Sequence, residues 1–329
     1  MKRALVTGSG GFLGKAIATR LLARGVEVVG VNRGEYPDLI ALGVDQRQGD
    51  LSDPATALAA AEGCDTVFHV AAKAGVWGDY NSYASANITA TEHVIAACEA
   101  HGISRLIYTS TPSVIHTGGD VEGIDESAPY PEHFHTHYPA TKAIAERLVL
   151  SAATDDLLTV ALRPHLIWGP GDNHLTPRIV DRARSGKLAF VGDGTNLVDS
   201  VYIDNAADAH VNAADALQPG AACVGRPYFI TNDEPLEIRD LVNRIVGAAG
   251  LEPVTKTVPP GVAFVVGALL EFVYGITGRL DEPPMTRFVA KQLSTAHWYD
   301  ISGARQDLGY APKVTIAEGI ERLAASFAE

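Results

Sequence analysis

Tyr138 and Lys142 lie four residues apart and carry side chains that can do acid–base chemistry. Side chains with this spacing share one face of a helix, and Pro139 directly after Tyr138 is typical of a first helical turn. The ordinary tyrosine pKa of about 10 falls by roughly three units if about 4 kcal/mol stabilises the phenolate. A cation at about 4 Å supplies roughly this much at an effective dielectric of about 20. The pair therefore predicts a tyrosine whose pKa Lys142 lowers, the alternative being an exposed helix pair without chemistry.

A glycine-rich turn near the N-terminus favours the chemical interpretation. The short apolar strand Ala4–Thr7 runs into Gly8-Ser9-Gly10-Gly11-Phe12-Leu13-Gly14, and an amphipathic helix is expected from Lys15 to Arg24. Gly8 permits the tight turn, Gly11 lets the backbone approach a pyrophosphate, and Gly14 allows close packing of helix on strand. The spacing differs from the dinucleotide fingerprint Gly-x-Gly-x-x-Gly, but in this context it predicts nucleotide binding at the helix N-terminus rather than a structural turn.

The second expected strand, Val26–Val31, ends in Asn32-Arg33-Gly34, where folds that bind NAD usually place a carboxylate for the ribose hydroxyls. No carboxylate is present at this point. Arg33 can instead form charge-assisted hydrogen bonds to a 2′-phosphate, and about 1.5 to 3 kcal/mol from such bonds means a roughly ten- to hundred-fold preference. The segment favours NADP(H) over NAD(H), unless Arg33 is only a solvated turn residue.

Strands and helices alternate along the first two thirds of the chain. Further strands are expected at 44–48, Thr66–Val70, Arg105–Thr109, Thr159–Leu162 and Tyr228–Ile230, with helices between them. This alternation predicts an α/β fold with a right-handed, doubly wound parallel sheet. Residues 171–329 stop alternating cleanly, which indicates a smaller C-terminal substrate lobe.

Polar and small residues follow several of these strands, at the sheet edge where such folds bind ligands. Asp50 and Leu51 are positioned to flank an adenine, and Ala71-Ala72-Lys73 is small enough to let a cofactor lie over a strand end. Ser110-Thr111-Pro112-Ser113 offers hydroxyls for a substrate oxygen, although turn capping is the alternative. His69 is expected to be structural.

Several of these motifs, taken together, resemble the extended short-chain dehydrogenase/reductases. They are Thr7 to Gly14, Asn87, Tyr138-x-x-x-Lys142, and Arg163-Pro164 followed by Ile167-Trp168-Gly169-Pro170. Within that superfamily the chain resembles the 3β-hydroxysteroid dehydrogenase-like branch over essentially its whole length. The resemblance implies a Rossmann-type, NADP-binding domain at 1–170, to which 195–232 returns, and a mainly substrate-binding lobe at 171–329.

The resemblance also implies roles for individual residues. The catalytic set is a hydroxyl, Tyr138 and Lys142, and a register matched on Val114 selects Thr111 as the hydroxyl. Ile115-His116 replace the usual aromatic-glycine pair, so Ser110 stays in reserve. Asn87 matches the asparagine that helps to hold the lysine. The cofactor-binding residues implied are Gly8, Gly11, Phe12, Leu13, Gly14, Asn32, Arg33, Asp50, Leu51, Ala71, Ala72, Lys73, Tyr138, Lys142 and Pro164.

The segments 72–78, 108–114 and 168–173 are similar to members that act on 2-alkyl-3-oxo fatty acids in bacterial long-chain olefin biosynthesis. The expected reaction is NADPH-dependent reduction of the ketone to a 3-hydroxy acid, with Tyr138 as proton donor. The alternatives are a sterol or steroid 3-hydroxy dehydrogenase, a nucleotide-sugar epimerase or reductase, and a nucleotide-sensing regulator without turnover. Candidates for binding a substrate carboxylate are Lys73, His165, Arg178 and Arg287.

Composition limits the partners. A net charge of -13 argues against a nucleic-acid partner, and 329 residues with 47% hydrophobic content can bury a substantial core. Cys64, Cys98 and Cys223 lack disulfide or zinc spacing, which predicts buried thiols in a cytoplasmic protein without a targeting segment. His133, His135 and His137 are interpreted as solvated loop histidines, and no metal is expected. The resemblance suggests a homodimer, with possible association with neighbouring pathway enzymes.

The segment 261–278 is apolar except for Glu271 and slightly shorter than a membrane span. We expect no transmembrane span here. A helix covering an apolar pocket for a lipid-like substrate ranks first, contact with a membrane surface second, and core packing third.

Overall fold

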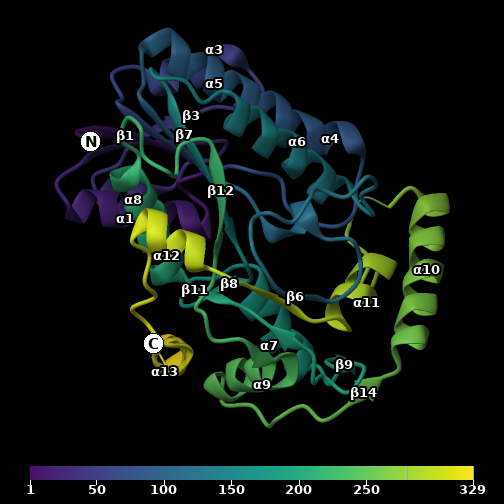
Figure 1. The fold of residues 1–329 in the computed structure, drawn as a ribbon. Coiled ribbons are helices and arrows are strands. Elements are labelled where there is room, and N and C mark those ends of the chain that lie inside the picture. The colour runs from purple at the N-terminus through teal and green to yellow at the C-terminus, as the bar shows by residue number, and fades with distance from the viewer. Residues whose placement is uncertain (280, 329) are drawn as a thin grey trace.

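The centre of the computed structural model, which describes residues 1–279 and 281–328, is a seven-stranded sheet in the order β3-β2-β1-β4-β5-β7-β12 (Figure 1). Every pair of neighbours in it is parallel. The strands are β1 (Arg3–Thr7), β2 (Glu27–Asn32), β3 (Asp45–Gln48), β4 (Thr66–His69), β5 (Arg105–Thr109), β7 (Leu158–Pro164) and β12 (Arg226–Ile230). The predicted doubly wound sheet is confirmed, and its order reverses between β1 and β4, where ligands bind in such folds.

Helices cover both faces of the sheet because its strands are apolar on both sides. All seven residues of β7 are buried, as expected for a strand between two layers. One face packs against α1 (Phe12–Ala23) and α8 (Ile203–Ala216), and the other against α3 (Pro54–Ala61), α5 (Ala90–His101) and α6 (His137–Ser151). A short helix, α2 (Pro37–Ala41), connects β2 to β3. The three cysteines are buried and unpaired, as predicted.

Asn87 lies in a helical segment that begins at Tyr80. Asp79 accepts hydrogen bonds from the backbone N–H groups of Asn81 and Ser82 and so starts α4 (Tyr80–Ala84). A π-helical turn, Ser85–Thr89, continues it into α5. Asn87 therefore lies inside a continuous helical segment, and the π-helical turn, a feature often found at functional sites, sets the direction of its side chain.

The second part of the molecule lies at the carboxyl edge of the main sheet and contains several strands of two to four residues. They are β6 (Val121–Ile124), β8 (Ile167–Trp168), β9 (Phe190–Val191), β10 (Leu197–Val198), β11 (Val201–Tyr202), β13 (Leu236–Glu237), β14 (Thr257–Val258) and β15 (His297–Tyr299). The helices are α7 (Leu175–Arg184), α9 (Ile238–Ala248), α10 (Pro260–Thr277), α11 (Arg287–Leu293), α12 (Ser302–Leu308) and α13 (Ile316–Ala328). Both β12 and α8 belong to the layers of the main sheet.

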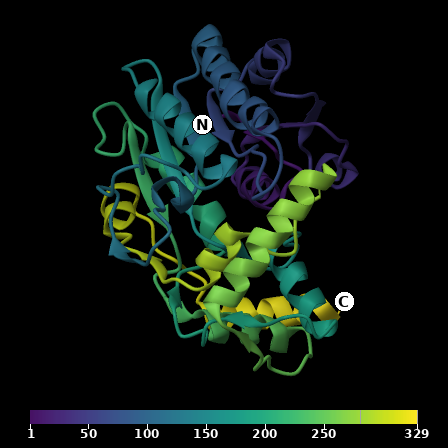
Figure 2. The same cartoon turned by 90° about the vertical axis from the view of Figure 1, so that its right-hand side faces the viewer.

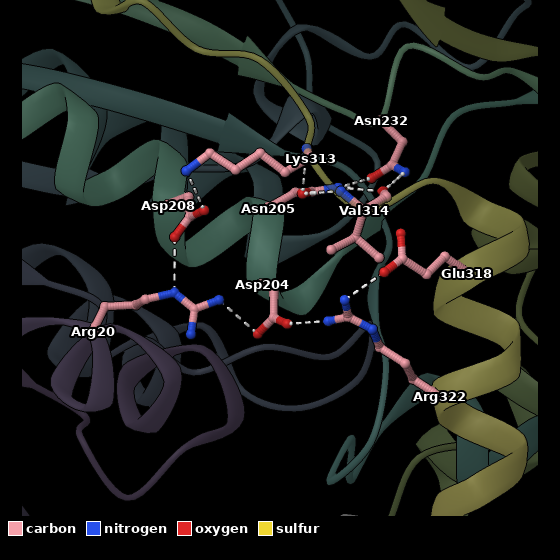
Figure 3. A network of polar contacts seen from close by, with 9 residues as sticks. All are labelled: Arg20, Asp204, Asn205, Asp208, Asn232, Lys313, Val314, Glu318 and Arg322. Atoms are coloured by element: carbon pink, nitrogen blue, oxygen red, sulfur yellow. Dashed lines mark hydrogen bonds and ion pairs between the residues drawn. The ribbon is translucent and has the colours of Figure 1, made fainter. Parts of the chain in front are cut away.

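A polar network joins the C-terminal segment to the first helix through α8 (Figure 3). Asp204 on α8 pairs with Arg20 of α1 at 2.9 Å and with Arg322 of α13 at 3.0 Å. The buried Asn205 accepts hydrogen bonds from the backbone N–H groups of residues 313 and 314 at 2.9 and 3.0 Å. The ion pairs are partly exposed and contribute little individually, so the buried amide is the more important link.

Helix α10 stands at one edge of the molecule and crosses the face that Figure 2 turns towards the viewer. It packs mainly on α11, and only 17% of its residues are buried. Its apolar side chains Val265, Leu269, Phe272 and Ile276 are at least 60% exposed. Core packing, one of the alternatives for this segment, is therefore wrong. By length and composition α10 could cross a membrane, which by itself is weak evidence for a span.

Candidate active site

Helix α6 places Tyr138 and Lys142 one turn apart at its N-terminal end, as predicted from their spacing. Lys142 is only 2% exposed, while Tyr138 is partly exposed to a cavity at the carboxyl edge of the sheet. The Lys142 Nζ donates a hydrogen bond to the Thr109 carbonyl at 2.6 Å and lies 4.1 Å from the centroid of the Tyr108 ring. The end of β5 therefore positions the ammonium.

The electrostatics of the pair differ from the expectation. Burial raises the pKa of Tyr138 to about 12, with the Thr111 hydroxyl acting in the opposite direction. Burial lowers the pKa of Lys142 to about 7, and Glu146 opposes this shift. The expected lowering of the Tyr138 pKa by Lys142 is not observed, because the ammonium is directed at the Thr109 carbonyl. The phenol is therefore protonated at neutral pH and can act as an acid.

A buried ion pair lies one turn beyond Lys142. The Arg163 Nε and Nη2 donate to the two carboxylate oxygens of Glu146 at 3.0 and 2.6 Å, and the Tyr130 hydroxyl donates to the same group at 2.6 Å. Glu146 is completely buried and Arg163 is 1% exposed, so losing one partner would leave a charge uncompensated. This pair joins α6 to β7 and places a negative charge near Lys142.

Two hydroxyls are close to Tyr138. The Thr111 hydroxyl acts on the phenol's pKa, accepts a hydrogen bond from the Ser113 N–H at 3.3 Å, and so starts the 3₁₀ turn Pro112–Ile115. The Ser110 Oγ is buried and has no hydrogen-bond partner among the described residues. Ser110 lines the same cavity as Tyr138, whereas Thr111 does not. Both hydroxyls therefore stay candidates for binding a substrate oxygen.

Asn87 connects the end of β4 to α6. Its amide accepts from the Lys73 N–H at 2.7 Å, and donates to the Lys73 carbonyl at 3.1 Å and to the Thr141 hydroxyl at 3.0 Å. The residue contacted on α6 is Thr141, which precedes Lys142. Asn87 thus fixes the backbone of Lys73 relative to the catalytic helix.

A cavity of about 720 Å³, here called the cofactor cavity, extends from the glycine turn to Tyr138. Fourteen of the fifteen predicted cofactor-binding residues line it: Gly8, Gly11, Phe12, Leu13, Gly14, Asn32, Arg33, Asp50, Leu51, Ala71, Ala72, Lys73, Tyr138 and Lys142. Pro164 does not, because it lies within β7, paired with Ile230 of β12. Their positions agree with the predicted role, which stays a prediction.

The glycine turn fits a bound pyrophosphate. Gly8 has a φ of +66°, and a Cβ atom there would lie 3.0 Å from the Ala71 Cα. A Cβ at Gly14 would lie 2.2 Å from the Gly8 carbonyl oxygen. Only glycine allows the turn, the strand end and the helix to approach so closely, which leaves the backbone open to the cavity. The arrangement is that of a dinucleotide site.

Neighbouring residues support the turn in ways the sequence did not reveal. The Asn32 amide accepts from the Gly10 N–H at 2.7 Å and donates to the Ser9 hydroxyl at 2.8 Å, so Asn32 holds the turn as well as lining the cavity. Arg33 is exposed at the end of β2. The pKa of Asp50 is lowered, mainly by a hydrogen bond from the Ser52 N–H and to a smaller extent by the charge of Arg33. Cavity residues that carried no sequence signal include Tyr36, Ser82, Ser85, Ala86 and His174.

Two further cavities flank α10 and α11. The aromatic cavity, about 700 Å³, is lined by Trp77, His137, Phe264, Tyr274 and Phe288 among others. The aliphatic cavity, about 590 Å³, is lined by Leu166 and mainly by apolar residues of α7, α9, α10 and α11, including Ile179, Leu241, Ala263, Val266 and Leu293. His137 in the aromatic cavity directly precedes Tyr138, and Leu166 in the aliphatic cavity directly precedes Ile167. Because Tyr138 and Ile167 line the cofactor cavity, each of the two cavities adjoins it along the chain. Both could hold apolar parts of a substrate.

The histidines singled out in the sequence are either exposed near the start of α6 or buried in the core. His133 and His135 are exposed in a loop, while His137 is exposed as the first residue of α6 rather than in the loop. His69 is buried between the hydroxyls of Thr7 and Thr91, and burial lowers its pKa to about 3, as suits a structural residue. Within residues 1–279 and 281–328, no group of three or more His, Cys, Asp or Glu side chains could hold a metal ion.

A search of family profiles matches residues 5–259 to the 3-beta hydroxysteroid dehydrogenase/isomerase family. The chain belongs to this family. It is 54% identical, over 98% of its length and 99% of the relative's, to the 2-alkyl-3-oxoalkanoate reductase of Stenotrophomonas maltophilia. It is 33% identical, over 99% of its length and 91% of the relative's, to the sterol-4-alpha-carboxylate 3-dehydrogenase, decarboxylating, of Mus musculus. The predicted family is confirmed.

The fold is shared with solved structures. The structure of MoeE5 in complex with UDP-glucose and NAD superposes with a TM-score of 0.77, at 24% identity, covering 100% of this chain and 99% of that one. The family, the relatives and the dinucleotide site together make the chain an oxidoreductase that uses a nicotinamide dinucleotide.

Proposed function

We propose that the protein reduces a 2-alkyl-3-oxoalkanoic acid to the 2-alkyl-3-hydroxyalkanoic acid with NADPH, as a step in long-chain olefin biosynthesis. The observation that carries the proposal is the full-length similarity to a reductase of that name in a chain whose Tyr138, Lys142 and glycine turn share one cavity. Two cavities beside this site, the aliphatic one and the aromatic one with its mixed aromatic and charged lining, suit a substrate with two hydrocarbon arms.

The chain's own residues then perform the acid–base part of the reaction. A nicotinamide dinucleotide, when bound, supplies the hydride. Tyr138, protonated at neutral pH because its pKa is raised to about 12, donates a proton to the oxygen of the ketone as it becomes an alkoxide. Thr111 or Ser110 donates a hydrogen bond to the same oxygen. Lys142, held by the Thr109 carbonyl, binds the nicotinamide ribose.

Arg33 supports the choice of NADP(H). It is exposed at the end of β2 and lines the cofactor cavity where the adenosine ribose is expected. No carboxylate stands at the end of β2, since the strand ends in Asn32 and the next residues are Arg33 and Gly34. A guanidinium at this position matches the geometry of a 2′-phosphate.

The two relatives share one chemical feature of their substrates. In a 2-alkyl-3-oxoalkanoate the carboxylate is attached to the carbon next to the reacting ketone, and in a sterol 4α-carboxylate it is attached to C4, next to the reacting C3. We infer that the substrate of this chain also carries a carboxylate on the carbon adjacent to the reacting one. The sterol acid is therefore the second candidate substrate.

The remaining parts of the proposal concern the cell. We place the enzyme in the cytoplasm as a homodimer. The exposed apolar residues of α10 suit contact with a neighbouring pathway enzyme or with a membrane surface that delivers a lipid-like substrate.

A spectrophotometric screen that follows the interconversion of NADP⁺ and NADPH tests the proposal. Because 3-oxo acids lose CO₂ readily, the oxidation of 2-alkyl-3-hydroxy acids is the practical direction. Activity with these acids and NADP⁺, above that with sterol 4α-carboxylates and with nucleotide sugars, is expected. Preference for a sterol acid or a nucleotide sugar would overturn the proposed substrate, and preference for NAD⁺ would overturn the proposed cofactor. If none of these compounds is turned over, the protein is a nucleotide-sensing regulator.

A further inference from the structure

Lys73 follows β4 and lines the cofactor cavity together with Tyr138 and Ser110. Its Nζ donates a hydrogen bond to the Ser82 hydroxyl at 2.5 Å and lies 4.7 Å from the centroid of the Tyr83 ring. The ammonium is therefore held against α4, and Lys73 lines the same cavity as the proton donor Tyr138.

The surroundings hold Lys73 in place. Asn87 hydrogen bonds to both its backbone N–H and its carbonyl. Gly78 lies against the end of the side chain, since a Cβ there would be in van der Waals contact with the Lys73 Nζ at 3.7 Å and with the Tyr83 ring at 3.5 Å. A long, flexible side chain thus starts from a fixed backbone and ends in a defined position, which reduces the entropy lost when it binds a ligand.

The charge of Lys73 is available for a ligand. An ammonium has three donors, and in the described part of the chain it makes one side-chain hydrogen bond and no ion pair. Asp79, close in sequence, uses its two carboxylate oxygens to accept the N–H groups of Asn81 and Ser82 at 3.0 Å each. That carboxylate caps α4 and forms no ion pair with Lys73, whose charge is the smallest of the causes that lower the Asp79 pKa, after the N–H groups of Asn81 and Ser82.

The other candidates for binding a carboxylate are less suitable. Arg178 pairs with Glu282 at 3.1 Å, and Arg287 pairs with Glu271 at 2.7 Å. His165 is buried, and burial lowers its pKa to about 4, so it is neutral at pH 7. Unlike Lys73, these three residues do not line the cavity that contains Tyr138.

We propose that the Lys73 ammonium binds the substrate carboxylate and selects acids whose carboxylate is on the carbon next to the reacting one. This rests on the proposed function, because that substrate class brings the carboxylate carbon within two bonds of the reacting carbon. The cation that binds it must therefore share a cavity with Tyr138, and Lys73 does. The Lys73 backbone is bonded to Asn87 and only its side chain is free to contact a ligand, so Lys73 determines specificity and does not transfer a proton.

The test compares a 2-alkyl-3-hydroxy acid with its methyl ester, which has the same carbon skeleton without the charge, in oxidation by NADP⁺. In Lys73→Met, kcat/KM for the acid should fall about 10- to 100-fold, the range of a charge-assisted hydrogen bond, while kcat/KM for the ester stays within a few-fold. Lys73→Arg should restore most of the loss on the acid. Tm should be close to that of the parent, and any change in NADPH affinity, measured by fluorescence titration, would affect acid and ester alike, so the acid-to-ester ratio reports the carboxylate contact.

Lys291→Met is the matched control, because Lys291 is an exposed lysine that lines the aromatic cavity instead. It should leave the acid-to-ester ratio unchanged. An unchanged ratio in Lys73→Met, equal losses on acid and ester, or a collapsed ratio in Lys291→Met would overturn the assignment of Lys73. A parent enzyme that oxidises neither the acid nor the ester would instead overturn the proposed function, so the two failures are distinguishable.

Discussion

At the scale of single residues, Tyr138 is the acid that the site offers. Burial raises its pKa to about 12, so it carries its proton throughout the neutral range. Tyr138→Phe keeps the ring and removes the proton donor, and kcat should fall by at least about 100-fold. NADPH affinity should stay within a few-fold, since the hydroxyl is needed for protonation. Steady-state kinetics with a fluorescence titration of NADPH measure both, and turnover near the parent's rate would remove Tyr138 from the mechanism.

Arg33 is the residue on which the cofactor preference depends. Arg33→Asp removes the guanidinium and adds a charge that repels a 2′-phosphate, so the ratio of NADPH to NADH affinity should fall more than about ten-fold. Arg47, on the neighbouring strand β3, does not line the cofactor cavity, and Arg47→Asp is a suitable control. If the ratio in Arg33→Asp equals that of the parent, Arg33 is only a turn residue.

The residues that sequence patterns predicted at the site are those with a fixed local spacing. The Tyr138–Lys142 pair and the glycines of the turn are defined by one helix and one turn. The hydrogen bonds from Asn87 to Lys73 and from Lys142 to Thr109 join residues 14 and 33 positions apart, and no local pattern encodes them. For the same reason the sequence left open whether Ser110 or Thr111 binds the substrate oxygen.

At the scale of secondary-structure elements, α10 separates the aromatic and aliphatic cavities. Phe264 lines the aromatic cavity at 38% exposure, whereas Leu269 lines neither cavity and is 60% exposed. The two residues on one helix therefore offer a matched pair for testing whether these cavities hold acyl chains.

If they do, kcat/KM should rise steeply with chain length in the parent. Four buried methylenes contribute about 3 kcal/mol, or roughly a hundred-fold. Phe264→Glu should reduce activity on long-chain acids more than on short ones, while Leu269→Glu should resemble the parent. The measurement is kcat/KM across a homologous series of 2-alkyl-3-hydroxy acids. A flat profile in the parent, or equal effects of the two substitutions, would contradict an acyl site beside α10.

The elements that the sequence predicted well are the long, regular ones. The strand Arg105–Thr109 has the expected bounds, and 261–278 forms the expected helix within one residue at each end. The π-helical turn and the short strands β10 and β13 escaped prediction. A strand of two residues is too short to show a periodicity in the sequence. Such a strand forms because of a partner distant in sequence, as β10 does with β15 about 100 residues later.

At the scale of the whole molecule, burial of histidines links stability to pH. Burial lowers the pKa of His69 to about 3, of His116, His165 and His210 to about 4, and of His297 to about 2. Below the ordinary value of 6.5, the unfolded chain binds protons that the native state does not, so acid destabilises the fold. Burial raises the pKa of Asp199 to about 7, which opposes this effect between pH 7 and about 4.

Five histidines outweigh one aspartate, so the free energy of unfolding should be lower at pH 5 than at pH 7. Urea denaturation at several pH values measures the slope, and each histidine contributes up to about 1.4 kcal/mol per pH unit. His210→Gln changes a fully buried site between α8 and β5. It should reduce the slope of the unfolding free energy against pH by the contribution of one histidine. Stability that stays constant or rises as the pH falls from 7 to 5 would show that these histidines are not neutral in the folded protein.

The central claim is hydride transfer from a nicotinamide cofactor to C3 of a 2-alkyl-3-oxo acid, with Tyr138 as proton donor. The most direct measurement uses NADPH that carries deuterium at both hydrogen positions of the nicotinamide C4, freshly prepared 2-alkyl-3-oxo acid and the parent enzyme. Mass spectrometry of the product should show one deuterium at C3 of the 3-hydroxy acid, and Tyr138→Phe should form almost none. A product without deuterium at C3, or no hydroxy acid from the parent enzyme, would contradict the account.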